Sequence, residues 1–284
     1  MTAPLRFLFV TLLATAAYQP ATGQQHLTAV SFNIRYDNPA DGAQAWPHRL
    51  PVVLRFLTRE QPDLLGLQEV LHHQYMQLDS ALPGYTSVAA GRTDGKIAGE
   101  MNPVFFRKDR FQLLQSNTFW LSETPGIAGS RAWGAGLPRI VTWVELLDRQ
   151  RQRRLFFFNT HFAHDSEAAR TRSAALLRRM VDSIAAGAPF FLTGDFNMPP
   201  TAEGYALLTQ SPRLLHDSYV IAETPPQGPT DTFNGFSGQP HPGRIDYIFV
   251  SNGLRVLQHR TVYRKENGLF ISDHWPVVAG VLVP

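Results

Sequence analysis

The chain has 284 residues, of which 44% are hydrophobic, and it carries a formal net charge of +3 at pH 7. This is enough apolar material for a sizeable core, and so small a charge is no evidence for nucleic acid binding by itself. No cysteine is present, so disulfide bonds are excluded. Arginine supplies most of the 26 basic residues. Arginine suits bidentate phosphate recognition. A genome-wide bias towards arginine explains the same composition without any role in binding.

Residues 1–23 have the pattern of a secretory signal peptide. Arg6 supplies a positive charge, residues 7–17 are apolar, and Ala21-Thr22-Gly23 offers small residues for cleavage. The apolar stretch is shorter than the roughly 20 residues of a transmembrane helix. We therefore expect export to the periplasm or the extracellular space, and no integral membrane segment in the mature chain. An uncleaved membrane anchor is the alternative.

After this segment, short apolar runs and helical periodicities alternate along the chain. The expected strands span 27–34, 64–68, 85–90, 104–107, 111–121, 139–147, 154–160, 190–193, 245–250, 255–262 and 277–282. The expected helices span 48–59, 72–81, 166–184 and 201–209, the last with Thr201 as a possible N-cap. Segments 124–136 and 222–243 are expected to be loops because of their glycine and proline content. We expect a monomer with one α/β domain over residues 24–284, its helices covering the sheets.

Several of these strands meet a polar cluster at one end. The clusters are Ser31-Phe32-Asn33, Leu67-Gln68-Glu69, Asn159-Thr160-His161, Gly194-Asp195-Phe196-Asn197, Arg244-Ile245-Asp246-Tyr247 and Ser272-Asp273-His274-Trp275. Binding sites of α/β proteins form at such sheet edges. Carboxylates suit Mg²⁺, which needs only one or two of them from the protein, while histidines donate hydrogen bonds and a further carboxylate activates water. This set of residue types points to the hydrolysis of a phosphate ester.

Taken in order, the six motifs resemble those of the endonuclease/exonuclease/phosphatase superfamily, in an exported bacterial-type form. The resemblance covers residues 27–284. It implies a four-layer α/β sandwich, in which two packed mixed β-sheets are flanked by helices. It also implies a divalent cation, Mg²⁺ or Mn²⁺, and a metal-activated water that attacks phosphorus.

The resemblance also implies roles for single residues. Glu69 is the principal metal ligand, with Asn33 and Asp273 near the metal. Asp195 orients or activates the attacking water, helped by Asn197. His161 and His274 contact the phosphoryl oxygens, and Asp246 fixes the tautomer of His274.

A second group of residues consists of candidates for contacts with the substrate. Arg139 stands at a strand start, where a guanidinium reaches a phosphate. Trp275, Trp133 and Phe233 are candidates for the wall of a substrate pocket, and Glu100 either touches the site or caps a turn. His164 is expected to be peripheral.

Three functions stay open at this point. The first is a metal-dependent hydrolase of phosphate monoesters or diesters on small or lipid-linked molecules. The second is an exported nuclease acting on DNA or RNA. The third is a non-catalytic binding protein on the same fold, which is disfavoured because no motif position carries an inert residue. The sequence does not name the substrate class or the preferred metal.

Overall fold

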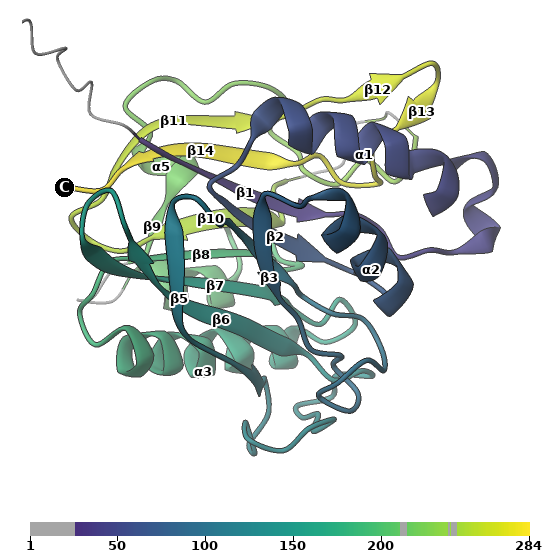
Figure 1. Ribbon diagram of the computed structural model, residues 1–284. Coiled ribbons are helices and arrows are strands. Elements are labelled where there is room, and N and C mark those ends of the chain that lie inside the picture. Colours follow the sequence, from purple (N-terminus) through teal and green to yellow (C-terminus); the bar gives the residue numbers. More distant parts are fainter. Residues whose placement is uncertain (1–25, 211–214, 238, 240–242) are drawn as a thin grey trace, which may run out of the picture.

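A computed structural model describes residues 26–210, 215–237, 239 and 243–284 (Figure 1). The signal peptide predicted for residues 1–23 lies outside these ranges. Among the residues described, no helix is both long and apolar enough to cross a membrane.

Most strands belong to two six-stranded sheets. The first sheet has the order β11 (Arg255–Thr261), β14 (Val277–Leu282), β1 (Leu27–Asn33), β2 (Leu64–Gln68), β4 (Val104–Arg107) and β3 (Tyr85–Val88). The second has the order β5 (Phe111–Trp120), β6 (Ile140–Asp148), β7 (Arg153–His161), β8 (Phe190–Asp195), β10 (Asp246–Val250) and β9 (His216–Asp217). Both sheets are mixed, because β1–β2 and β7–β8 are parallel and their other neighbours are antiparallel.

Helices cover the outer faces of both sheets (Figure 1). On the first sheet lie α1 (Trp46–Glu60) and α2 (His72–Ala81), and on the second lie α3 (Glu167–Ala185) and α4 (Glu203–Thr209). The inner faces pack against each other through aliphatic and aromatic side chains such as Val104, Phe157 and Ile248. The predicted fold of two packed mixed sheets flanked by helices is therefore confirmed.

Element ends differ from the sequence-based expectations where side chains give weak signals. The helix expected from residue 201 begins at Glu203 and has Ala202 as its N-cap, so the prediction of Thr201 was wrong. The short elements η1 (Pro39–Gln44), α5 (Ser218–Ile221), β12 (Lys265–Glu266) and β13 (Leu269–Phe270) were not expected. None of them is long enough to show a hydrophobic period.

The two parallel strand pairs explain why the polar motifs meet. Parallel neighbours end at the same sheet edge, so Asn33 and Glu69 leave the first sheet together, and His161 pairs with Asp195 in register. Strand β10 runs against β8 and starts with Asp246 opposite Asp195. The segment before β14 reaches the end of β1 in the same way and delivers residues 272–276.

A buried polar cluster fixes the two sheets relative to each other just below this edge. Asn159 of β7 donates through Nδ2 to the carbonyl oxygens of Leu67 (2.7 Å) and Pro103 (3.0 Å), which belong to the first-sheet side. Its Oδ1 accepts from Gln68 (2.7 Å) and Thr193 (3.0 Å). The Asn159 amide therefore makes four hydrogen bonds at the interface between the sheets, and its side chain has no solvent exposure.

We expect Asn159→Leu to destabilise the protein by about 3–5 kcal/mol, because it leaves several buried donors and acceptors without partners. Urea unfolding measures this change. The matched control is Asn117→Ala on the exposed face of β5, which should change stability by less than about 0.5 kcal/mol. Equal effects of the two substitutions would contradict the role of Asn159 as an inter-sheet clamp.

Candidate active site

The polar strand ends of both sheets surround one cavity of about 510 Å³. Six of the eight predicted catalytic residues line it: Glu69, His161, Asp195, Asn197, Asp273 and His274. The other two, Asn33 and Asp246, hydrogen-bond to these from beneath. The structure therefore brings the whole predicted set together.

Glu69 is held in an unusual backbone conformation at the end of β2. Its φ of 60° lies in the left-handed region, which a non-glycine residue adopts at some energetic cost. The carboxylate compensates by accepting from Asn33 Nδ2 (3.0 Å) and from the Tyr36 N–H (3.2 Å). Both carboxylate oxygens are thereby fixed at the mouth of the cavity.

Asn33 links the carboxylates of the two sheets. The Arg35 N–H donates to Asn33 Oδ1 (3.0 Å), so the amide oxygen must face the backbone. Nδ2 consequently faces Glu69 and donates to Asp195 Oδ2 (3.0 Å) as well. In this arrangement Asn33, which the family resemblance places near the metal, sets the spacing of two carboxylates.

Asp195, Asp246 and His274 form a buried charged group. His274 Nδ1 hydrogen-bonds to Asp246 Oδ2 (2.8 Å), and its Nε2 lies 3.8 Å from Asp195 Oδ2. Burial opposes the imidazolium, yet the carboxylates of Asp246 and Asp195 raise the pKa of His274 well above its usual value. Burial, and then the charge of Asp246, raise the pKa of Asp195 to about 7. A protonated imidazole thus stands beside a carboxylate that titrates near neutrality.

His161 has the opposite character. Burial, and then the nearby Arg139, lower the pKa of His161 well below its usual value, so the ring is neutral. The Asn197 amide donates from Nδ2 to the Phe162 carbonyl oxygen (3.1 Å) and lies 3.0 Å from His161 Nε2. His161 Nε2 also lies 3.5 Å from Asp195 Oδ2, whereas the buried Nδ1 lies 4.0 Å from Glu100 Oε2 and has no hydrogen-bond partner among the described residues.

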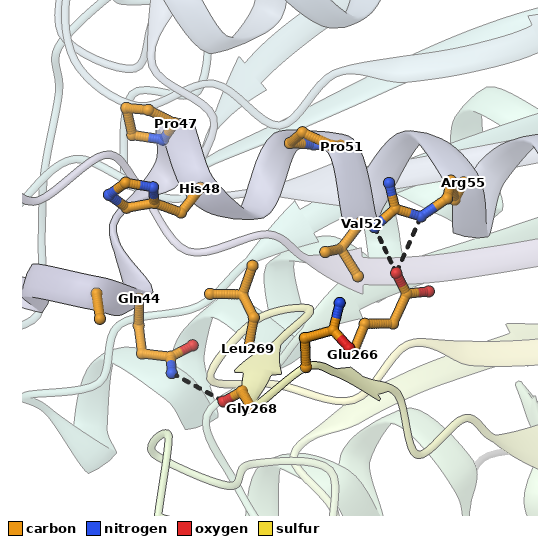
Figure 2. A pocket seen from close by; sticks show the side chains of 11 residues that line it. Gln44, Pro47, His48, Pro51, Val52, Arg55, Glu266, Gly268 and Leu269 are labelled. Carbon is orange, nitrogen blue, oxygen red and sulfur yellow. Dashed lines mark hydrogen bonds and ion pairs between the residues drawn. The ribbon is translucent and has the colours of Figure 1, made fainter.

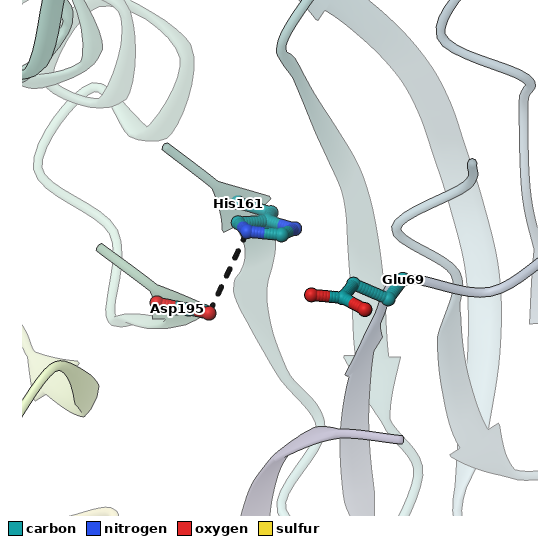
Figure 3. A group of neighbouring side chains, drawn as sticks. All are labelled: Glu69, His161 and Asp195. Atoms are coloured by element: carbon teal, nitrogen blue, oxygen red, sulfur yellow. Dashed lines mark ion pairs between the residues drawn. The ribbon is translucent and has the colours of Figure 1, made fainter. Parts of the chain in front are cut away.

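The donor set at this edge suits a divalent cation. Ligand atoms of Glu69, His161 and Asp195 lie within 4.8 Å of one another (Figure 3). Two carboxylates with a neutral imidazole are a plausible partial shell for Mg²⁺ or Mn²⁺, which take their remaining ligands from water and substrate. A second group of equally close ligand atoms consists of Asp195, Asp246 and His274. Asp273, which was expected near the metal, belongs to neither group among the described residues.

Arg139 and Trp275, the two predicted substrate contacts, have different surroundings. Arg139 lines the cavity, and its buried Nε and Nη1 have no hydrogen-bond partner among the described residues, while its Nη2 lies 3.1 Å from His164 Nδ1. Trp275 does not line it: its ring packs against Tyr263 (4.7 Å) and Phe270 (5.7 Å) in the core. The short segment after His274 turns the tryptophan under the first sheet, so its expected substrate contact is corrected to a core position.

Of the other candidates, Phe233 lines the cavity and its ring lies 5.0 Å from that of His274. Glu100 also lines it and is paired with Arg92 through two 2.8 Å hydrogen bonds. His164, expected to be peripheral, lines the cavity as well, whereas Trp133 packs against the core beneath α3.

The sequence reasoning missed two arginines that shape the site. Arg49, fully buried in α1, donates to the carbonyl oxygens of Gln44, Ile34, Arg35 and Ile271. It thereby holds the chain on both sides of the site, after Asn33 and before Asp273. Arg35 lies beside Glu69 and Asp273. Arg35 follows the Ser31-Phe32-Asn33 motif by two residues, but nothing in the periodicity of α1 distinguishes Arg49 from a solvent-facing arginine.

A larger hollow of about 600 Å³ lies between α1 and the β12–β13 hairpin (Figure 2). Arg55 and Glu266 pair across one side, and Gln44 Nε2 donates to the Gly268 carbonyl oxygen (3.3 Å) on another. None of the predicted site residues lines it. Size alone therefore does not select the active site in this molecule.

Comparison with known proteins agrees with this geometry. The model of the Endonuclease/Exonuclease/phosphatase family matches residues 30–274. An endonuclease/exonuclease/phosphatase from Bacteroides vulgatus is 36% identical, with a TM-score of 0.88, over 92% of this chain and 100% of that chain. A mannosyl-6-phosphatase from Bacteroides thetaiotaomicron is 33% identical, with a TM-score of 0.85, over 90% of this chain and 100% of that chain.

Curated relatives match less completely. Nocturnin of Xenopus laevis is 29% identical over 231 residues, which are 75% of this chain and 57% of that protein. Across the curated relatives it matches, the chain spans 26–59% of their length.

We expect Asp246→Asn to lower the pKa of His274, because the carboxylate that stabilises the imidazolium is replaced by a neutral amide. Histidine NMR signals of the metal-free protein, followed from pH 5 to pH 10, measure the change. Asp165→Asn is the control, since Asp165 is exposed and accepts from the Gly136 N–H instead. An unchanged titration of His274 in Asp246→Asn would contradict the assignment.

Proposed function

The chain belongs to the Endonuclease/Exonuclease/phosphatase family, and we propose that it is a divalent-metal-dependent hydrolase of phosphate monoesters carried by small molecules. The observation that carries this proposal is the meeting of Glu69, His161, Asp195 and His274 around one cavity, with Arg139 in its wall. The protonated His274, the neutral His161 and the carboxylate of Asp195 can serve different roles in phosphate ester hydrolysis, such as binding the phosphoryl group and accepting a proton from water.

Residues at the cavity bind and orient the phosphoryl group. The protonated His274 directs Nε2–H towards the non-bridging oxygens, and Arg139 offers Nε–H and Nη1–H groups that have no acceptor in the described part of the chain. Glu69, with Asp195 and His161 nearby, would hold a Mg²⁺ or Mn²⁺ ion, which would supply Lewis-acid polarisation of the phosphoryl group.

Asp195 is the proposed proton acceptor for the attacking water. Asn33 Nδ2 and the Asn197 N–H hold the carboxylate at 3.0 Å and 2.9 Å, which fixes its direction. A pKa of about 7 in the absence of metal suits a group that takes up a proton at neutral pH. Asp246 keeps His274 protonated and in one orientation while this occurs.

Two observations support a small phosphomonoester. The site is a cavity walled by Tyr36, Leu137 and Phe233, which suits a compact ligand better than a duplex. The similar protein from Bacteroides thetaiotaomicron is named a mannosyl-6-phosphatase, so a sugar phosphate is the first substrate to test. Export, suggested by residues 1–23, fits a role in releasing phosphate outside the cytoplasm.

A nuclease is the second candidate, and the similarity to nocturnin supports it. A nuclease contacts several phosphates along a strand and usually does so with a stripe of basic side chains. The arginines lining this cavity are Arg35, which is paired with Asp41, and Arg139. Two such arginines suit the binding of one phosphoryl group better than the binding of several phosphates along a nucleic acid strand.

We expect Glu69→Gln to lower metal-supported turnover by more than about 100-fold while the fold is retained, because the amide keeps the shape but loses the charge. The assay is phosphate or product release from mannose 6-phosphate, inositol phosphates, sphingomyelin, a simple phosphodiester and oligonucleotides, each with Mg²⁺, Mn²⁺ or EDTA. Glu223→Gln, at an exposed pair with Arg255, is the control. Full activity of folded Glu69→Gln, or turnover that EDTA leaves unchanged, contradicts metal dependence. Turnover confined to oligonucleotides selects the nuclease.

We expect Arg139→Met to lower kcat/KM for the phosphomonoester about 10- to 100-fold, the loss typical of a charge-assisted hydrogen bond. Arg131→Met is the matched control, because Arg131 is exposed on the same loop and donates to the Gly136 carbonyl oxygen. Steady-state kinetics distinguish the two variants. Equal kinetics for both would remove Arg139 from the substrate contacts.

A further inference from the structure

Arg35 occupies an unusual position for a basic side chain at a metal site. Its guanidinium lies 3.9 Å from Glu69 Oε2 through Nη1 and 3.7 Å from Asp273 Oδ2 through Nε. The family resemblance of the sequence implies a metal ion held by Glu69, with Asp273 near it. A positive group of the chain itself therefore lies beside both of these carboxylates.

The guanidinium is held firmly. Asp41 of η1 accepts from Nε (3.1 Å) and from Nη2 (3.1 Å) in a bidentate pair, which limits rotation of the side chain. The Tyr36 ring lies 4.4 Å from the guanidinium carbon and covers one face. The Arg35 carbonyl oxygen is anchored by Arg49 Nη2 (3.2 Å). Arg35 thus cannot leave the two carboxylates without breaking several contacts.

The remaining ligand groups leave room for one ion. Of the two clusters of suitable spacing among the described residues, one consists of Asp195, Asp246 and His274. Its His274 Nδ1 and Asp246 Oδ2 already hydrogen-bond to each other at 2.8 Å. The other cluster, Glu69 with His161 and Asp195, keeps carboxylate oxygens that face the cavity.

We propose that Arg35 acts as a built-in counter-cation between Glu69 and Asp273, so that the active site takes a single divalent ion. A second divalent ion beside Asp273 would lie next to the guanidinium, and like charges at such a distance repel strongly. Arg35 is then a positioning residue that sets the metal count. This inference rests on the metal dependence proposed above.

The test counts Mn²⁺ ions bound by the folded chain without substrate, using the EPR signal of free Mn²⁺. We expect one equivalent for the wild type and two for Arg35→Met, because Glu69 and Asp273 lose their common partner. The first ion should also bind about tenfold more tightly in the variant, since a repulsive charge is gone. Arg35→Met/Asp273→Asn should return to one equivalent.

Arg55→Met serves as the control, because Arg55 pairs with Glu266 on the surface of α1 and should leave the count at one. Arg35→Gln replaces the methionine variant if the latter does not fold, with the same expected count. Two equivalents in the wild type, or one or none in the folded Arg35 variants, overturn the role of Arg35. No Mn²⁺ binding by the folded wild type overturns the proposed metal-dependent function as well.

Discussion

The active site depends on the buried hydrogen bonds by which Asn159 joins the two sheets. One half of the catalytic set comes from the first sheet and the other half from the second, so a shift between sheets would separate Glu69 from Asp195. Gly66 makes the close contact possible, because a Cβ there would stand 2.2 Å from Thr193 Oγ1 and 2.6 Å from Asn159 Oδ1. Such a satisfied polar cluster in an otherwise apolar interface specifies one alignment, which dispersion forces between aliphatic side chains would not.

Most carboxylates around the cavity have a cationic side chain as a partner. Glu100 is bound by Arg92, Asp246 by His274, and Glu69 and Asp273 share Arg35. Asp195 is held chiefly by amide donors, and its raised pKa reflects burial next to Asp246 without a guanidinium in hydrogen-bond contact. Protonation of Asp195 is therefore favoured by its surroundings, which agrees with its proposed role as proton acceptor.

Much of this site follows from the sequence, because strand ends are readable as apolar runs that stop at polar residues. The parallel pairs β1–β2 and β7–β8 then bring those ends together whatever the loops do. Residues whose roles depend on distant contacts could not be read in this way. Arg49 looks like any arginine of an amphipathic helix until its four carbonyl partners are known. Trp275 follows a catalytic motif, yet the chain direction after His274 decides that its ring enters the core.

The walls of the cavity are tied to the same strand ends that carry the chemistry. The hydroxyl of Thr232 accepts from the N–H groups of Ile245 and Asp246, and the Asn234 N–H donates to the Asp273 carbonyl oxygen (2.7 Å). Phe233 between them is consequently fixed against His274. A wall built in this way is preorganised, so a ligand is selected by its fit to an existing shape more than by loop closure. A preformed cavity of this kind is consistent with the small phosphomonoester proposed above as the substrate.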